Sequence, residues 1–311
     1  MGRAFVRGVS LKPSDVGRFL LALLAVAAIG LVVVVRVTHR PAARPPASPA
    51  QPPSVASASA PQACDPPAWR AAAQANARSL ATLAWSPFGR AESGWRIYAA
   101  AVGRLIGSTC PPDTAGFAAA YGRWQQGQTL APDGVFKPEE FERMKNRMAL
   151  ERPFVQFTSK GLCPGPPPPQ ALEAATAAEG YGGKVVSLRR GALAAYRRMV
   201  ADARADGAVA GADDFKLISG YRGPEEEAAR CADGGCNTVS KASCSAHRTG
   251  LAADIFLGRA AGSDPVSTDE ANRKAIVATP AYRWLVTHAD RYGFLNYPFE
   301  PWHWEWTGEP P

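Results

Sequence analysis

Two short segments in the C-terminal third of the chain restrict its fold and chemistry more than any others. They are residues 245–254 (SAHRTGLAAD) and residues 300–306 (EPWHWEW). In the first, a loop changes into an alternation of apolar residues typical of a strand, so His247 should precede a strand that carries Asp254. In the second, side chains that alternate with period two should place three tryptophans on one strand face and His303 on the other.

His247, Asp254 and His303 form a ligand set that suits catalytic zinc, because two imidazoles and one carboxylate leave a fourth position open for water. A further group is then needed to handle protons. Glu300, three residues before His303, is the first candidate for a general base. Glu305 is the alternative, since it would share a strand face with His303. The two segments therefore predict a hydrolytic zinc site.

The distribution of charge argues against a nucleic-acid partner. The formal net charge is +8, but residues 1–63 hold seven of the 35 basic residues and one of the 27 acidic residues. The remaining 28 basic and 26 acidic residues leave the globular part of the chain nearly neutral. A protein that binds nucleic acid usually presents a basic surface, which this composition does not supply.

All six cysteines follow an apolar N-terminal run. An even number of cysteines on one side of a membrane predicts disulfides in an oxidising compartment, and no Cys-x2-Cys spacing favours a thiolate metal site. The sequence does not choose among the possible pairings. Cys231, Cys236 and Cys244 lie close before His247, so we expect at least one bridge to stiffen this approach to the site.

Residues 19–35 are uncharged and mainly apolar, at the short end of the length that crosses a bilayer. A cleaved signal peptide is the alternative, but its apolar region is usually shorter and a small-residue cleavage site follows closely, whereas Arg36, His39 and Arg40 follow here. We therefore expect an uncleaved transmembrane anchor. Residues 1–18 would be cytoplasmic, and the cysteines place the rest of the chain on the other side.

The chain beyond this anchor divides into a linker and two folded regions. Residues 36–68 form a Pro- and Ala-rich linker with nine prolines between Pro41 and Pro67. Residues 69–163 carry apolar residues at helical spacing and predict a small helical domain. Its Trp-Gln helix and Leu-x-x-Asp-Gly turn loosely resemble peptidoglycan-binding modules, although an ordinary helical core explains the aromatic residues equally well. Residues 170–308 mix short strands with helices and predict an α+β domain.

Four motifs occur in order within residues 170–308. They are Ser219-Gly-Tyr-Arg222, Ser245-x-His247-x-x-Gly250-x-Ala252-x-Asp254, Tyr292-Gly-Phe294 and Glu300-Pro-Trp-His303. Together they resemble the motifs of D-alanyl-D-alanine carboxypeptidases of the VanY type, which belong to a wider group of zinc peptidases that includes lysostaphin and the hedgehog signalling domain. The resemblance implies a small antiparallel sheet flanked by helices. It also implies one zinc ion per chain on His247, Asp254 and His303.

The same resemblance implies roles for other side chains. Glu300 would be the general base, and Arg222 would neutralise the oxyanion that develops on the scissile carbonyl. Ser245 would bind the terminal carboxylate of the substrate, while Tyr221 and Trp302 would line the substrate site. The expected substrates are peptidoglycan stem peptides. The expected location is the bacterial inner membrane, crossed once by residues 19–35, with the catalytic domain in the periplasm or otherwise outside the cytoplasm.

One position departs from the family pattern. These carboxypeptidases usually carry glutamine five residues after the arginine, where this chain has Glu227. An ionised glutamate only accepts hydrogen bonds and would repel the terminal carboxylate of a substrate. Either Glu227 points elsewhere, or the enzyme is an endopeptidase whose substrate has no free terminus there. A non-catalytic zinc protein that binds the cell wall is a further alternative, against which Glu300 and Arg222 argue.

Overall fold

The structure is a computed structural model that describes residues 63–232, 235–236 and 242–311. The predicted cytoplasmic N-terminus, the predicted anchor at residues 19–35 and most of the linker lie outside these residues. Within the described ranges, no helix has both the length and the apolar character that crossing a bilayer requires. All of the described residues belong to one compact unit.

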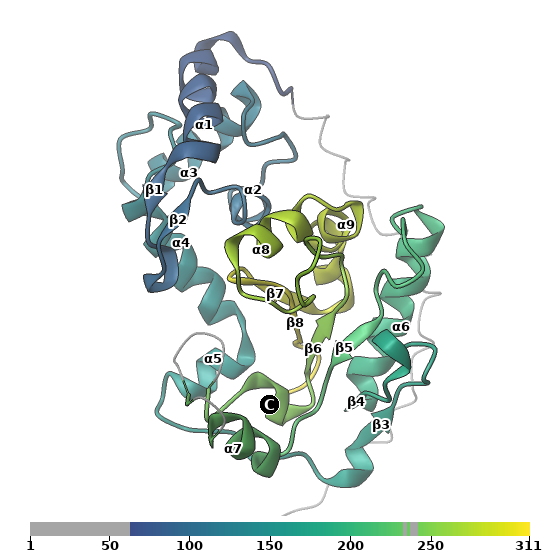
Figure 1. Cartoon of the computed structure of the whole chain (residues 1–311). Helices are drawn as coiled ribbons and strands as arrows, with labels where there is room; N and C mark the ends of the chain where they lie inside the picture. Colours follow the sequence, from purple (N-terminus) through teal and green to yellow (C-terminus); the bar gives the residue numbers. More distant parts are fainter. Residues whose placement is uncertain (1–62, 233–234, 237–241) are drawn as a thin grey trace, which may run out of the picture. The chain divides into compact units, whose positions relative to one another are not determined.

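Residues 67–158 are mainly helical (Figure 1). Five helices follow one another: α1 (Arg70–Thr82), α2 (Ala99–Leu105), α3 (Ala115–Gly127), α4 (Pro138–Glu151) and α5 (Pro153–Thr158). The two-residue strands β1 (Ala84–Trp85) and β2 (Glu92–Ser93) pair between α1 and α2. We call residues 67–158 the helical segment. Proline supplies the first residue of α4 and of α5, where its missing N–H costs no helical hydrogen bond.

The aromatic residues of the helical segment form its core. Trp95 stacks on Phe136 with ring centroids 4.3 Å apart, and Phe117, Tyr121 and Phe141 are buried around them. The Trp-Gln helix and the Asp-Gly turn bond to each other: Gln125 donates to Asp133 at 2.8 Å and accepts from the backbone N–H of Gly134 at 2.8 Å. These polar groups therefore hold the turn in place.

Residues 172–306 combine short strands with helices. Four strands form the central sheet in the order β5-β6-β8-β7, and every neighbouring pair is antiparallel. They are β5 (Leu217–Ser219), β6 (Ala252–Ile255), β7 (Phe294–Tyr297) and β8 (Glu300–Trp306). A separate hairpin pairs β3 (Leu172–Ala174) with β4 (Ser187–Arg189). The predicted α+β class, with small antiparallel sheets and helices, is confirmed.

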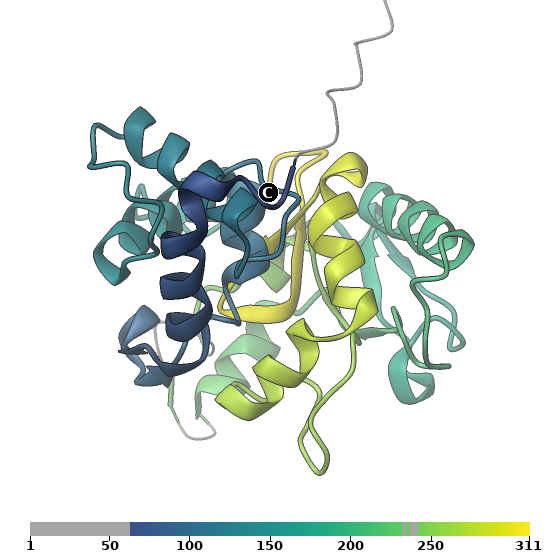
Figure 2. The same cartoon turned by 90° about the horizontal axis from the view of Figure 1, so that it is seen from above.

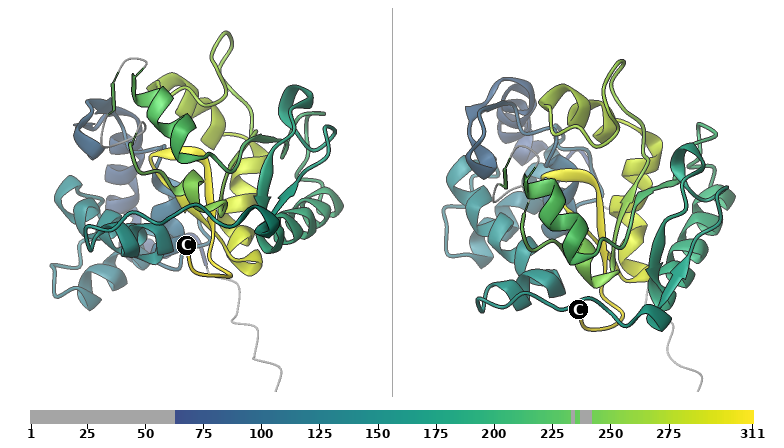
Figure 3. Two further views of the ribbon diagram at one scale, coloured as in Figure 1. Left: turned by 90° about the horizontal axis from the view of Figure 1, so that it is seen from below. Right: turned by 60° about the horizontal axis from the view of Figure 1, so that its bottom comes forward.

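Helices surround the central sheet. Seen from above, the helical segment lies on one side of the sheet and α6 (Arg190–Ala205) on the other (Figure 2). The remaining helices are α7 (Pro224–Ala232), α8 (Glu270–Val277) and α9 (Pro280–His288). The connection from α5 to β3 runs across the molecule between these two sides (Figure 3).

The helical segment packs directly against the sheet and its helices. Contacts join α2 to α9 and α4 to β7, and one cluster of buried apolar residues extends from the helical segment through the sheet. A buried ion pair also crosses this contact, because Arg273 on α8 lies 2.5 Å from Glu92 on β2 and both side chains are 1% exposed. Tyr98 donates its hydroxyl hydrogen to the same carboxylate at 2.9 Å.

All six cysteines are paired, as expected from their number and position. Cys64–Cys110 lies within the helical part of the chain. Cys163 begins a proline-rich stretch after α5, residues 163–169, and its bridge to Cys244 ties this stretch to the residue before Ser245. Cys231–Cys236 closes a short loop at the end of α7. Two bridges therefore constrain the segment that leads to His247, where the sequence predicted at least one.

Candidate metal and catalytic site

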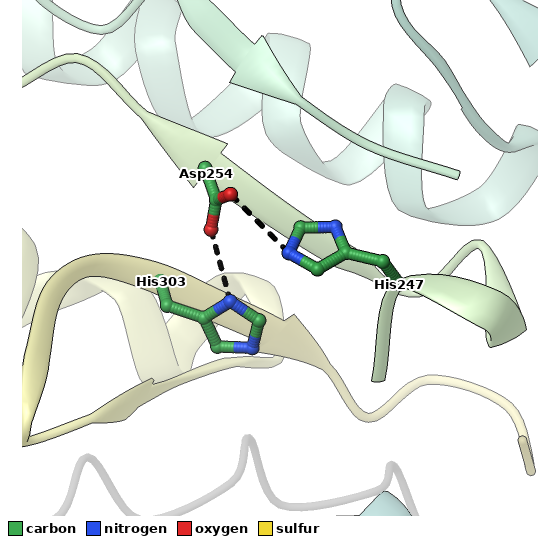
Figure 4. Close-up of side chains that lie close together, drawn as sticks. All are labelled: His247, Asp254 and His303. Atoms are coloured by element: carbon green, nitrogen blue, oxygen red, sulfur yellow. Dashed lines mark hydrogen bonds and ion pairs between the residues drawn. The ribbon is translucent and has the colours of Figure 1, made fainter. Parts of the chain in front are cut away.

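Three side chains meet where β6 and β8 pair. Asp254 on β6 lies opposite His303 on β8 in the sheet register, and His247 lies just before β6 in the short 3-10 helix η5 (Ala246–Thr249). One donor atom of each residue lies within 4.8 Å of the others, and all three side chains are buried. Figure 4 shows the Asp254 carboxylate between the two imidazole rings. The predicted set is thus brought together.

Hydrogen bonds on the far side of each ring decide which nitrogen faces the site. His247 Nδ1 lies 2.7 Å from the backbone carbonyl of Gly220, which only accepts, so Nδ1 donates and Nε2 faces Asp254 at 3.3 Å. His303 presents Nδ1 to Asp254 at 2.9 Å, while its Nε2 lies 3.1 Å from Glu305 Oε1. Both rings are therefore held in orientation from behind, as metal-ligating histidines usually are.

The loop that carries His247 has local reasons for its shape. The Ser245 hydroxyl accepts a hydrogen bond from the His247 backbone N–H at 3.3 Å and caps η5. Gly250 ends η5 with φ +70°, a conformation that costs glycine little. A side chain there would also approach Leu172 to 3.0 Å. The Ser-x-His-x-x-Gly spacing therefore produces a capped turn that delivers the imidazole to β6.

The charges of the three residues are mutually compensating. Burial acts to raise the pKa of Asp254, but the charges and hydrogen bonds of His247 and His303 outweigh it and hold this pKa below its ordinary value. Burial lowers the pKa of His247. Burial acts the same way on His303, but its hydrogen bonds to Asp254 and Glu305 raise its pKa to about 9. A metal ion would have to displace that proton.

The donor set fits a zinc ion. Zinc prefers nitrogen and oxygen ligands of this kind, and two neutral imidazoles with one carboxylate leave room for a further ligand. Each histidine already has its other nitrogen engaged by an acceptor, so the nitrogen available to an ion is fixed in both rings. These residues therefore form a candidate metal site.

Glu300 begins β8 and lines the same cavity as the three candidate ligands. Burial raises the pKa of its carboxyl group to about 7, with the charge of Asp254 acting in the same direction. A carboxyl group that titrates near neutrality can both accept and return a proton. Glu305 does not line the cavity, and Arg152 and His303 hold its pKa down to about 2 in spite of its burial. The geometry favours Glu300 over Glu305 as the base.

Arg222 follows β5 and brings a buried positive charge to the cavity. Its backbone N–H donates to the His247 carbonyl at 3.1 Å, and its guanidinium donates to the Ser219 hydroxyl at 3.2 Å. Glu226 approaches it only to 3.7 Å and is largely exposed. Burial and the charge of Arg230 lower its pKa, so the protein stabilises this cation poorly. Such a group is suited to binding an anion.

The cavity has a volume of about 1380 Å³ and is lined by two parts of the chain. One part comprises the site residues together with the expected substrate-binding residues Tyr221, Ser245 and Trp302. The other is the helical segment, which contributes Lys145, Asn146, Arg152 and Val155. The helical segment is therefore part of the cleft.

Glu227, the departure from the family pattern, does not line the cavity. It is 2% exposed and accepts hydrogen bonds from the Ser245 backbone N–H at 3.1 Å and from Arg248 Nε at 2.7 Å. Arg248 Nη2 contacts the same carboxylate. Of the two interpretations of this position, the structure supports the one in which Glu227 points elsewhere. Its negative charge is compensated by Arg248.

The sequence analysis missed two side chains that support the site. Arg248 neutralises Glu227. A basic residue directly after His247, together with an acidic residue at a position that departs from the family pattern, was a signal that could have been used. Arg152 contacts Glu305 from 153 residues away in the sequence. No local sequence pattern predicts that contact.

A buried imidazole–carboxylate cluster in a cleft, beside a carboxyl group that titrates near neutrality and a buried guanidinium, has the composition of a hydrolytic metal site. Residues 185–309 match the family model VanY, described as D-alanyl-D-alanine carboxypeptidase. The resemblance of the four motifs is thereby confirmed, and a carboxypeptidase-like function of this general kind is supported. No curated protein matches the chain. The helical segment lies outside the matched residues.

Proposed function

We propose that this chain is a zinc-dependent D-alanyl-D-alanine carboxypeptidase that acts on peptidoglycan stem peptides in the bacterial cell envelope. One observation supports this most directly. His247, Asp254 and His303 lie together in the same cavity as Glu300 and Arg222, within the residues that match the family model.

His247 Nε2, the Asp254 carboxylate and His303 Nδ1 would hold the zinc ion. When bound, the ion supplies a Lewis acid that polarises the scissile carbonyl and acidifies water. The protein's part is to keep the donors in place. The Gly220 carbonyl and the Glu305 carboxylate do this for the two imidazoles by accepting hydrogen bonds from the ring nitrogens that face away from the site.

Glu300 would move the proton. Hydrolysis adds the oxygen of a water molecule to the carbonyl carbon, breaks the C–N bond and places one proton on the leaving amine. An ionised Glu300 accepts the proton from the attacking water and then returns it to the amine nitrogen. The pKa of about 7 lets the same carboxyl group perform both steps near neutral pH.

Arg222 would stabilise the negative charge that develops on the carbonyl oxygen. Its guanidinium is already desolvated, and the Glu226 carboxylate that approaches it lies 3.7 Å away and is largely exposed, so the developing anion improves its surroundings. Ser245, Tyr221 and Trp302 line the same cavity and are in place to contact the peptide.

Cleavage of a terminal residue requires that the site tolerate a free carboxylate. The sequence placed Glu227 where it would repel one, but that side chain is turned away and paired with Arg248. This favours the carboxypeptidase over an endopeptidase. The endopeptidase remains the second candidate because the cavity exceeds the roughly 300–1,000 Å³ of most small-molecule sites and has room for a branched peptide.

Attachment to the inner membrane through residues 19–35, with the enzyme in the periplasm, belongs to the same proposal. Three disulfides among the described residues support an oxidising compartment. The proline-rich linker would separate the enzyme from the bilayer.

Mass spectrometry of muropeptides tests this function. The detergent-solubilised full chain would be incubated with pentapeptide muropeptides and with cross-linked dimers, before and after a chelator and after zinc is restored. We expect chelator-sensitive loss of one terminal alanine. Splitting of the cross-link instead would make the endopeptidase correct, and no change in either substrate would leave a wall-binding protein.

A further inference from the structure

Arg152 connects the helical segment to the candidate metal site. It lies outside the residues that match the family model, yet it contacts Glu305, which in turn contacts His303. We propose that Arg152 is a positioning residue for the metal site: it holds Glu305, which fixes the ring of His303. This inference rests on the proposed zinc site, and it makes the helical segment a component of that site.

Glu305 has two partners and little freedom. The carboxylate is 2% exposed, and its Oε1 atom lies 3.1 Å from His303 Nε2. The same oxygen accepts from Arg152 Nε at 3.0 Å and also contacts Arg152 Nη2. Among the described residues, two charged partners reach this carboxylate: the Arg152 guanidinium and the His303 imidazole. One oxygen atom thus joins the ring of His303 to the guanidinium.

Arg152 is itself held rigidly. Pro153 follows it, and the residue before a proline disfavours helical geometry, so α4 ends at Glu151 and Arg152 is extended with φ −81° and ψ 120°. Its guanidinium lies over the ring of Tyr297 at 4.4 Å, and the residue is 7% exposed. The break between two helices therefore presents a fixed planar donor to β8.

The consequence of losing Arg152 follows from burial. A buried carboxylate without a cation is costly, so Glu305 would no longer be held in its present position. It would then hold the His303 N–H less firmly. A carboxylate behind a metal-ligating histidine fixes the ring and its tautomer, and removing such a partner typically weakens metal affinity by about 10- to 100-fold.

An ion pair that only joins the helical segment to the sheet side should not affect metal affinity. The Glu92–Arg273 pair also joins the helical segment to the sheet side and is even more deeply buried, but neither residue contacts a candidate ligand in the described structure. Loss of that pair should lower stability without changing metal affinity. Glu92→Gln is therefore a matched control for weakened packing between the same two parts.

The experiment uses the full chain, stripped of metal and titrated with zinc against a chromophoric chelator. The variants are Arg152→Met, Arg152→Lys, Glu305→Gln, the Arg152→Met/Glu305→Gln pair and Glu92→Gln. Thermal unfolding of each metal-free protein is measured in parallel. The visible absorption spectrum after substitution with cobalt reports the ligand geometry without depending on activity.

We expect Arg152→Met to weaken zinc binding by about 10- to 100-fold and to change the cobalt spectrum. Arg152→Lys keeps the positive charge but not the forked guanidinium, so it should lose less zinc affinity. It also keeps the test valid if Arg152→Met does not fold. In the Glu305→Gln background, removal of Arg152 should have little further effect. Glu92→Gln should lower the melting temperature with unchanged zinc affinity.

The inference is overturned if the Arg152 variants bind zinc as the wild type does, or if Glu92→Gln weakens zinc binding as much as Arg152→Met. A wild-type chain that binds no zinc would instead refute the proposed function, and the inference with it. The two failures are thus distinguished by the wild-type titration alone.

Discussion

Arg248 and Glu227 form an ion pair behind the loop that carries His247. Arg248 Nε donates to Glu227 Oε2 at 2.7 Å, and the other carboxylate oxygen accepts from the Ser245 backbone N–H at 3.1 Å. The carboxylate therefore holds the loop in place through both of its oxygens. It also explains why an acid can occupy this position without facing the substrate.

Glu227→Gln should not increase the removal of terminal alanine, because the carboxylate is outside the cavity. It should instead lower the free energy of unfolding by about 1–3 kcal/mol, since the partly buried Arg248 guanidinium loses its buried, charged acceptor. Chemical denaturation measures this loss. Glu225→Gln, an exposed neighbour on α7, is the control and should change stability by no more than about 0.5 kcal/mol. A clear rise in trimming would show that Glu227 does reach the substrate.

Glu300→Ala should reduce kcat by about 100- to 10,000-fold while the chain still binds zinc, because the base is removed and the three ligands remain. Steady-state kinetics on a peptide ending in D-Ala-D-Ala measures the loss of kcat, and metal analysis of the same sample measures the bound zinc. Glu305→Ala, in contrast, should lower zinc content. Normal turnover by the Glu300 variant would contradict its role as the base.

The pH profile should reflect the ionisation of Glu300. The base acts as a carboxylate, so activity should rise as pH increases through its pKa, which burial places at about 7 in the metal-free protein. A bound cation nearby lowers that value, so the midpoint of the acidic limb should lie at or below about 7. Measurement of kcat/KM across pH tests this. A limb that persists in Glu300→Gln would assign it to another group.

Removal of the Cys163–Cys244 bridge should cost about 2–4 kcal/mol of stability, because the bridge joins residues that are 81 positions apart. It should also reduce activity, since Cys244 directly precedes Ser245 and the His247 turn. The Cys64–Cys110 bridge is the matched control because it lies away from the cavity. Paired Cys→Ser variants, compared by denaturation and kinetics, test both statements. Equal activity losses in the two would argue against a local effect.

The sequence was informative where structure depends on neighbours along the chain. Strand alternation predicted that His303 faces a site, although Trp302, expected on the packed face, lines the same cavity, and the change from loop to apolar alternation correctly placed His247 before β6. The pairing of Asp254 with His303 then follows from ordinary antiparallel register. The candidate ligands could therefore be named in advance.

The contacts that depend on packing between distant segments were not predictable in this way. Arg152 reaches Glu305 only because α4 packs against β7, and nothing near residue 152 encodes that arrangement. The direction of Glu227 depends on Arg248 across a turn. The disulfide pairing is likewise decided by which loops the fold brings together, since many pairings satisfy the same cysteine count.

The cleft draws its chemistry and its further peptide contacts from different parts of the chain. The groups proposed to break the bond lie on β6, β8 and the loops beside them, whereas Asn146 and Val155 line the same cavity from α4 and α5. Substitutions at these two positions could thus retune the choice of peptide while the chemistry stays intact. At Arg152, in contrast, the two properties cannot be varied independently.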